Sequence, residues 1–198
     1  MAENHDKSAL RAEVTALRAR LAPEEHAARS RAASLRLLDL PVLEHARTVS
    51  VYAALGAELD PTAAILGLEA RGVRVVYPRI RAGDRRLAFA ACPAAALVPG
   101  PRKAKEPPAS APEVDPAQVD VIVVPGVAFT ADGLRLGRGG GYYDATLAAV
   151  PHARRVGLAF ELQLVPALPA EPHDAAVELV VTELRTLTPH APADRTPR

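Results

Sequence analysis

Residues 133–144, GLRLGRGGGYYD, contain five of the twelve glycines in the chain. Glycine lets backbone N–H groups turn toward an anion, and the guanidinium groups of Arg135 and Arg138 match the geometry of phosphate oxygens. The segment is not a P-loop, since no Gly-Lys-Ser/Thr closes it, and Tyr142 stands where a dinucleotide fingerprint has its third glycine. A tight turn with solvated arginines is the alternative. The combination of residue types favours a phosphate site.

A strand and a helix are expected to position this glycine segment. The β-branched run 119–124 predicts a strand buried on both faces, and residues 142–150 predict a helix. A helix N-terminus offers free N–H donors and a favourable dipole to an anion. Asp144 falls in the first turn of that helix, where a carboxylate either stabilises the dipole or binds Mg²⁺ beside nucleotide phosphates. Strand, glycine loop and helix together predict an anion site.

Two cations near the N-terminus suit the same chemistry. Residues 5–21 predict an amphipathic helix, because apolar residues recur there at helical spacing. The apolar stripe consists of Leu10, Val14, Leu17 and Leu21. Lys7 and Arg11 lie four residues apart close to this stripe, where like charges repel and cations oppose the dipole at the helix N-terminus. An anion held between them accounts for the arrangement, whereas spacing alone favours a solvated basic face.

The rest of the chain alternates between predicted strands and helices. Helices are expected at 24–38, at 41–46 and after Asp60-Pro61, ending at Gly72; strands are expected at 48–54, 73–77, 87–91, 154–160 and 176–182. We expect strand 87–91 at a sheet edge and the proline-rich stretch 99–116 as a surface loop. The alternation predicts an α/β fold with a largely parallel sheet and helices on both faces. We expect one domain, 1–187, and a disordered tail, 188–198.

Composition and charge exclude several functional classes. The net charge of +1 gives no basic field for nucleic acid or an anionic membrane. Cys92 is the only cysteine, so neither a disulfide within the chain nor a zinc cluster is expected, and the six histidines lack metal-ligand spacing. We also expect no signal peptide, no transmembrane segment and no Gly-x-Ser-x-Gly nucleophile. These features predict a cytoplasmic protein whose partners are small molecules.

The stretch 135–144, RLGRGGGYYD, with its approach at 124–129, VPGVAF, resembles the signature of the 5-formyltetrahydrofolate cyclo-ligase family. The resemblance implies a three-layer α/β/α sandwich. It also implies a reaction in which Mg-ATP phosphorylates the formyl oxygen of 5-formyltetrahydrofolate. Nitrogen 10 of the folate then attacks, and 5,10-methenyltetrahydrofolate, ADP and phosphate are released. A monomer or weak dimer is expected.

The resemblance also implies site residues outside the glycine segment. Lys7 and Arg11 match a Lys-x-x-x-Arg that contacts nucleotide phosphates, and Glu58, beyond a predicted strand end, matches a glutamate that holds the pterin ring. The implied ATP-binding residues are Lys7, Arg11, Arg135, Gly137, Arg138, Gly139, Gly140, Gly141, Tyr142 and Tyr143. The implied substrate-binding residues are Ala53, Glu58, Arg138, Gly139, Gly140, Gly141 and Tyr142. The implied catalytic residues are Arg138 and Tyr142, and the implied Mg²⁺ ligands are Asp144 and Asp174.

Three departures from the family pattern and two rival functions accompany this interpretation. Gly140 stands where some members carry lysine, Glu178 stands where an aspartate is expected, and aromatic residues make up 4% of the chain. Taken alone, Glu58 and Asp174 are ordinary solvated loop carboxylates. One rival is a non-catalytic regulator that binds nucleotide or folate. The other is a sugar-phosphate isomerase or acyl-CoA transferase on a similar scaffold, which needs a general base beside the loop and no paired metal carboxylates.

Overall fold

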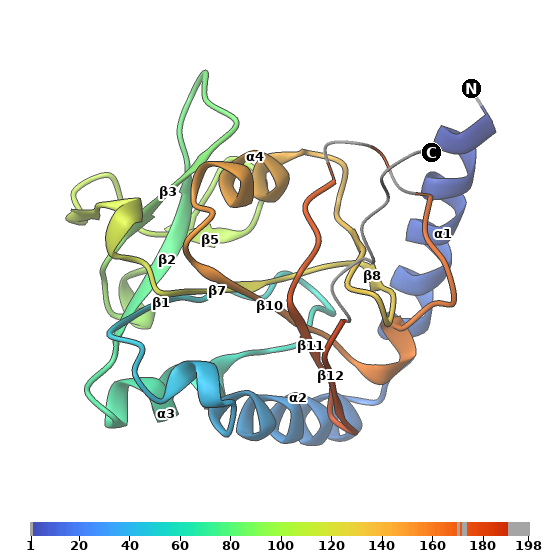
Figure 1. The fold of residues 1–198 in the computed structure, drawn as a ribbon, viewed down its shortest axis with the longest axis horizontal. Coiled ribbons are helices and arrows are strands. Elements are labelled where there is room, and N and C mark those ends of the chain that lie inside the picture. The colour runs from blue at the N-terminus through green and yellow to red at the C-terminus, as the bar shows by residue number, and fades with distance from the viewer. Residues whose placement is uncertain (1, 170, 172–173, 190–198) are drawn as a thin grey trace, which may run out of the picture.

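An eight-stranded sheet forms the centre of the protein in the computed structural model, which describes residues 2–169, 171 and 174–189, with side chains from residue 7 onward (Figure 1). The strand order is β12-β11-β10-β7-β1-β2-β3-β6. In that order the strands are Thr186–Leu187, Leu179–Val181, Arg154–Leu158, Val121–Val124, Thr48–Ser50, Arg74–Ile80, Leu87–Ala90 and Glu113–Val114. The five strands from β11 to β2 are parallel, and β12, β3 and β6 pair antiparallel to their neighbours. The predicted, largely parallel sheet is confirmed.

Helices cover both faces of this sheet. The helices α2 (Pro23–Leu38) and α3 (Thr62–Ala70) pack on one face, and α4 (Tyr142–Ala149) lies on the other (Figure 1). The 3₁₀ helices are η1 (Pro41–Leu43), η2 (Ala94–Ala96), η3 (Pro116–Gln118) and η4 (Glu161–Gln163). Two small hairpins stand beside the main sheet: β4 (Val98–Pro99) with β5 (Lys105–Glu106), and β8 (Ala128–Phe129) with β9 (Arg135–Leu136). The expected three-layer α/β/α sandwich is therefore confirmed.

The central strand β7 is buried on both faces, as its β-branched sequence predicts. Val121 and Val123 pack in the core cluster beneath α2 and α3, whereas Ile122 and Val124 pack in the cluster beneath α4. Alternate residues of a strand point to opposite faces, so a continuous apolar run is what a strand between two helical layers requires. The strand thus holds the Pro125-Gly126 turn, and with it the start of the glycine loop, at a fixed edge of the sheet.

The first helix, α1 (Ala2–Ala19), packs beside the sheet and contacts the β8–β9 hairpin. Val14 is buried there, but Leu17, predicted in the apolar stripe, is 39% exposed. Arg18 takes its place and is 3% exposed, because its Nη1 donates to the carbonyl oxygen of Gly126 at 3.3 Å. The expectation for Leu17 was therefore wrong. A polar contact with the turn after β7, and not apolar burial alone, sets the rotation of this helix.

Other sequence expectations require correction at the ends of elements. The strand expected at 48–54 ends at Ser50, and β3 is not a sheet edge, because β6 pairs with it. The stretch 99–116 contains β5 and β6, and Glu106 within it is buried. None of the described helices is both long enough and apolar enough to span a bilayer. Most of the predicted tail, residues 190–198, lies outside the described residues.

The turn chemistry at α3 largely agrees with the sequence. The carboxylate of Asp60 accepts hydrogen bonds from the backbone N–H of Thr62 at 2.9 Å and from its hydroxyl at 2.6 Å. The helix begins one residue later than expected, at Thr62, and Gly72 follows its end with a φ of +76°. A left-handed residue after a helix favours glycine because it has no Cβ. Asp60 therefore has a structural role next to the functional Glu58 candidate.

Candidate active site

A cavity of about 1040 Å³ lies at the carboxyl ends of β1 and β7. Ligands of open α/β sheets bind at this edge, where loops from neighbouring strands meet. All of the residues predicted for the site line this cavity: Lys7, Arg11, Ala53, Glu58, Arg135, Gly137, Arg138, Gly139, Gly140, Gly141, Tyr142, Tyr143, Asp144 and Asp174. The fold therefore brings together residues that are up to 167 positions apart in the sequence.

The glycine loop joins β9 to α4 and forms one wall of the cavity. Gly139 and Gly141 have φ values of +84° and +68°, a region that favours glycine. Gly141 is the N-cap of α4 and offers no side chain to the first N–H groups of the helix, which are left for a ligand. Gly133, predicted as part of the same loop, does not line the cavity. Its φ of +84° makes the turn between β8 and β9, where a Cβ would lie 2.4 Å from the Val177 carbonyl oxygen.

Two cations of α1, Lys7 and Arg11, line the cavity. The Nζ of Lys7 lies 2.8 Å from the carboxylate of Glu171 and 3.2 Å from that of Asp174, and the Lys7 side chain is 8% exposed. Burial lowers the pKa of Lys7, but the hydrogen bonds to the two carboxylates outweigh burial and leave this pKa above its ordinary value of 10.5. The Nε of Arg11 donates to the carbonyl oxygen of Gly137 at 2.9 Å. Lys7 is therefore a charged group, and Arg11 adjoins the glycine loop directly, while both cations line the same cavity.

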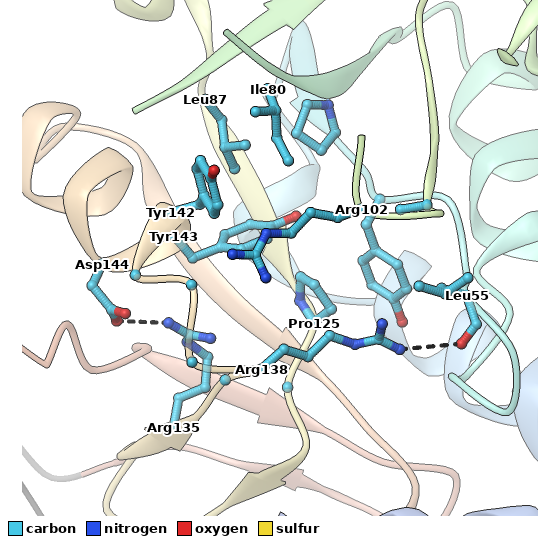
Figure 2. A pocket seen from close by; sticks show the side chains of 18 of the residues that line it. Leu55, Ile80, Leu87, Arg102, Pro125, Arg135, Arg138, Tyr142, Tyr143 and Asp144 are labelled. Atoms are coloured by element: carbon cyan, nitrogen blue, oxygen red, sulfur yellow. Dashed lines mark hydrogen bonds and ion pairs between the residues drawn. The ribbon is translucent and has the colours of Figure 1, made fainter. Parts of the chain in front are cut away.

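Arg135 lies beneath the loop and pairs with the helix that follows it. Its Nη2 donates to the Asp144 carboxylate at 2.6 Å, while its Nε is buried and has no hydrogen-bond partner (Figure 2). A Cβ on Gly137 would lie 2.6 Å from Nη1 of Arg135, so the glycine leaves room for the guanidinium. The guanidinium carbon also lies 5.7 Å from the Tyr143 ring centroid. Arg135 thus orients Asp144 as well as adding positive charge below the loop.

Arg138 crosses the cavity toward the segment that follows β1. Its Nε lies 3.0 Å from the Glu58 carboxylate. Its Nη2 donates to the Leu55 carbonyl oxygen at 3.4 Å (Figure 2). Glu58 is 9% exposed and also accepts a hydrogen bond from the Leu55 N–H at 2.9 Å. A carboxylate that is held by one backbone donor and one arginine has acceptor positions left for a ligand. The ion pair between Arg138 and Glu58 therefore connects the glycine loop with the segment that follows β1.

The two tyrosines after the glycine loop have different surroundings. Tyr143 packs against the core cluster beneath α4, and desolvation by this packing, with the charge of Glu58, raises the pKa of its hydroxyl far above the ordinary value. Its hydroxyl therefore stays protonated and can only act as a neutral hydrogen-bonding group. The Tyr142 ring lies against the guanidinium of Arg102, with 5.4 Å from the guanidinium carbon to the ring centroid. Tyr142 thus lies between the glycine loop and the β4–β5 hairpin.

The structure adds charged residues that sequence reasoning did not single out. Arg85, Arg102, Lys103, Lys105 and Glu171 also line the cavity. Glu106 also lines the cavity; it is buried and accepts a hydrogen bond from the backbone N–H of Ile80, which the sequence did not indicate. In total the lining has eight lysine or arginine side chains and five carboxylates, a surplus of three positive charges. The whole chain has a net charge of only +1. Positive charge is therefore concentrated at the cavity, as an anionic ligand requires.

Glu178, whose role the sequence left in doubt, lies outside the cavity lining. It forms ion pairs with Arg154 and Arg155 of β10, at 3.2 Å in the case of Arg155. Its backbone N–H also donates to the Arg155 carbonyl oxygen at 2.8 Å. These contacts give Glu178 a structural role at the start of β11.

Comparisons with known proteins identify the family. The model of the 5-formyltetrahydrofolate cyclo-ligase family matches residues 3–183. The 5-formyltetrahydrofolate cyclo-ligase of Escherichia coli K12 is 35% identical over 167 residues, covering 82% of this chain and 92% of that protein. The enzyme of the same name from Mycolicibacterium smegmatis is 36% identical over 145 residues, covering 70% of this chain and 75% of that protein.

Solved structures agree with this result. The 5,10-methenyltetrahydrofolate synthetase of Aquifex aeolicus superposes with a TM-score of 0.80 at 30% identity, covering 95% of both chains. The synthetase of Mycoplasma pneumoniae has a TM-score of 0.74 at 23% identity, covering 90% of this chain and 99% of that one, and shares the fold. From its sequence, its sheet and the position of its glycine loop, the chain belongs to the 5-formyltetrahydrofolate cyclo-ligase family, whose members convert 5-formyltetrahydrofolate into 5,10-methenyltetrahydrofolate.

Proposed function

We propose that the cavity is the active site in which ATP and Mg²⁺ drive the cyclisation of 5-formyltetrahydrofolate. The observation that carries this proposal is the ion pair between Arg138 and Glu58, 3.0 Å long, which joins the cationic glycine loop to the carboxylate expected to hold the pterin. A site that phosphorylates a folate must hold the nucleotide phosphates and the formyl group next to each other. Arg138 lies where these two groups meet.

The phosphates of ATP are proposed to lie against Lys7, Arg11 and the glycine loop. In the described structure Lys7 is paired with Glu171 and Asp174, and the Arg11 guanidinium donates to a loop carbonyl oxygen. Phosphate oxygens offer both side chains charge-assisted hydrogen bonds. The backbone N–H groups of Gly141 and of the first turn of α4 add further donors. Their use does not require a long charged side chain to lose its water.

The pterin ring is proposed to bind at Glu58, with Ala53 forming part of the pocket wall. Glu58 is fixed by the Leu55 N–H, so its carboxylate presents a defined direction to the ring. An ionised carboxylate accepts two hydrogen bonds side by side, which suits an amino group next to a ring N–H. When the substrates bind, Arg138 exchanges its contact with Glu58 for the formyl or phosphoryl oxygen, since one guanidinium cannot satisfy both sets of acceptors at full strength.

Mg²⁺ is proposed to bind near Asp144 and Asp174, which line the same cavity. The donor set fits, because Mg²⁺ uses one or two carboxylates together with nucleotide phosphates and water. The described residues contain no group of three or more His, Cys, Asp or Glu side chains suited to a metal, so the phosphates must complete the coordination. Bound Mg²⁺ supplies charge neutralisation on the phosphates. Arg135 holds the Asp144 carboxylate from below at 2.6 Å.

The residues then act mainly by positioning and by electrostatic stabilisation. The γ-phosphoryl group of ATP is transferred to the formyl oxygen, and Arg138 stabilises the charge on the group in transfer. Nitrogen 10 attacks the formyl carbon, the carbon–oxygen bond breaks, phosphate leaves with that oxygen, and the proton of nitrogen 10 is lost. Tyr142, beside the loop, borders the reacting formyl group. Oligomeric state and the cytoplasmic location stay predictions.

The test is a turnover assay on the full chain with 5-formyltetrahydrofolate, ATP and Mg²⁺, followed by the near-ultraviolet absorbance of the methenyl product. We expect an absorbance rise that disappears when either ATP or Mg²⁺ is omitted. Arg138→Ala should lower kcat by about a hundredfold or more, because an interaction made in the transition state is lost. No absorbance change, with nucleotide binding still seen by calorimetry, would favour the non-catalytic regulator.

A further inference from the structure

Two arginines outside the signature converge on the glycine loop. Nη1 of Arg85 lies 3.3 Å from the position that a Cβ on Gly141 would occupy, and the guanidinium carbon of Arg102 lies 3.5 Å from that position on Gly140. Arg85 belongs to the turn between β2 and β3, and Arg102 belongs to the turn between β4 and β5. Figure 2 shows Arg102 reaching across the cavity toward Tyr142 and Tyr143. Two separate loops therefore bring positive charge to the same glycines.

Neighbouring arginines of the same surface are neutralised, whereas these two are not. Arg86 pairs with Asp84 at 3.2 Å, and Arg79 pairs with Glu113 at 2.5 Å. Within the described residues, Arg85 and Arg102 form no ion pair and no hydrogen bond with a protein acceptor, and the Arg102 guanidinium lies against the Tyr142 ring. Like charges gathered without an anion repel one another. An anion held beside Gly140 and Gly141 would give both exposed arginines a partner that the described protein residues do not supply.

The position of Arg102 is fixed by a tight turn. The N–H of Lys103 donates to the Gly100 carbonyl oxygen at 3.1 Å, and the N–H of Gly100 donates to the Ala104 carbonyl oxygen at 2.8 Å. Pro101 occupies the second position of this turn, where its fixed φ is favourable. Gly100 is required because a Cβ would lie 2.5 Å from the buried Glu106 side chain. The turn and the stacking on Tyr142 thus restrain the guanidinium toward the loop.

We propose that Arg85 and Arg102 form an additional anion-binding site for the terminal phosphates of the nucleotide. The Arg102 guanidinium lies beside Gly140 and that of Arg85 beside Gly141, next to the N-terminus of α4. Glu58, the carboxylate proposed to hold the pterin ring, lies instead beside Arg138. The arginine forks match phosphate oxygens geometrically. The identity of the anion as a nucleotide phosphate rests on the proposed function; the convergence of the two arginines does not.

The experiment is calorimetric titration of the full chain with ATP, with inorganic triphosphate and, separately, with 5-formyltetrahydrofolate. Arg85→Ala and Arg102→Ala should each weaken binding of ATP and of triphosphate about tenfold and leave folate binding unchanged. Arg86→Ala, which removes the same charge one residue away outside the cavity lining, is the matched control and should bind all three ligands like wild type. Arg102→Lys keeps the charge but not the fork, and should weaken ATP binding by about threefold.

The proposal is overturned if Arg85→Ala and Arg102→Ala bind ATP as Arg86→Ala does, or if they weaken folate binding alone, which would identify the anion as a folate carboxylate. The proposed function fails separately. If wild type binds triphosphate in an Arg102-dependent way but forms no methenyl product, the anion site stands and the cyclisation proposal falls. If wild type binds neither ATP nor triphosphate, both proposals are wrong.

Discussion

The two N-terminal helices have similar compositions but bury different chemistry. Both α1 and α2 are rich in alanine, arginine and leucine. Among the α1 side chains that the structure describes, those of Lys7, Val14 and Arg18 are buried, and the helix packs against the β8–β9 hairpin, η4 and the cavity. The buried positions of α2 are Ser30, Ala33, Ser34, Leu37 and Leu38, and its contacts are with α3 and the sheet. Helix α1 therefore presents cations to the cavity, and helix α2 contributes side chains to the hydrophobic core.

The difference shows that side chains can be buried for function, as the charged groups of α1 are, or for stability, as the core residues of α2 are. Burying an ammonium or guanidinium group is unfavourable unless partners compensate, and a buried ion pair is weak evidence for stability. Lys7 is compensated by Glu171 and Asp174, which lie in the cavity where an anion or a metal can take over either partner. Nothing comparable occurs on the buried face of α2. We therefore expect substitutions in α1 to change function and substitutions in α2 to change stability.

The largest effect is expected from removing both cavity cations of α1. Lys7→Met combined with Arg11→Met should lower kcat/KM by about a thousandfold, because two charge-assisted contacts with the phosphates are lost. The matched control combines Arg20→Met with Arg31→Met, two exposed arginines outside the cavity lining. Steady-state kinetics on both double variants measures the difference. Equal rates for the two double variants would show that α1 has no special role.

The next effect is a loss of stability in α2. Leu37→Ala should lower the free energy of unfolding by about 3 kcal/mol, because Leu37 is fully buried and its loss leaves a cavity in the core. The folded fraction should keep the wild-type kcat. Urea unfolding gives the free energy, and turnover well below the unfolding midpoint gives kcat. A tenfold drop in kcat without loss of stability would reverse the roles assigned to the two helices.

A smaller effect is expected at Arg18, which is charged like the cavity cations of α1 but buried like the core residues of α2. Burial lowers the pKa of Arg18, and its Nε is buried without a hydrogen-bond partner. Arg18→Met should therefore change the free energy of unfolding by no more than about 1 kcal/mol. It should lower kcat about tenfold, because the Gly126 carbonyl keeps only the donor from Gln163, at 2.8 Å. Loss of several kcal/mol of stability with an unchanged kcat would make Arg18 a purely structural residue.

The smallest effect is a pH dependence specific to α1. The folded pKa of Lys7 lies above its ordinary value of 10.5, so the protonated form is favoured by folding. This contribution to stability is fully present below the unfolded pKa and is lost as the pH rises through the folded pKa. The stability difference between wild type and Lys7→Met should therefore be constant from neutral pH up to about 10.5 and decrease above it, as measured by urea unfolding at increasing pH. The difference for Leu37→Ala should stay flat, and a flat curve for Lys7→Met would contradict the account.

The sequence was sufficient wherever one local pattern determined the structure. The apolar run of β7 and the start of α4 follow from local patterns, so this strand and this helix were predicted close to their observed bounds. The loop between them was not, because residues 135–136 form β9 in an unpredicted hairpin with β8. The layer architecture followed from the alternation of elements. Gly133 shows the limit of this reasoning, because it resembles its neighbours in sequence but forms the β8–β9 turn.

Residues whose roles depend on distant partners could not be predicted. Arg18 replaces Leu17 on the buried face of α1 only because the Gly126 carbonyl oxygen lies opposite, 108 positions away. Arg102 lies in a proline-rich stretch whose two-residue strands have no detectable period, so the stretch reads as an ordinary surface loop. Lys7 was identified as a site residue by family resemblance, since its spacing from Arg11 alone favoured a solvated basic face. Its partner Glu171 has no local signal at all.

The role of the α1 cations in nucleotide binding is tested most directly by the affinity of the full chain for ATP, measured by calorimetry on wild type, Lys7→Met and Arg31→Met. We expect Lys7→Met to bind ATP at least about tenfold more weakly than wild type, because a charge-assisted phosphate contact is lost. We also expect Arg31→Met to bind like wild type. Wild-type affinity in Lys7→Met would contradict the claim that the buried cations of α1 are held for the nucleotide.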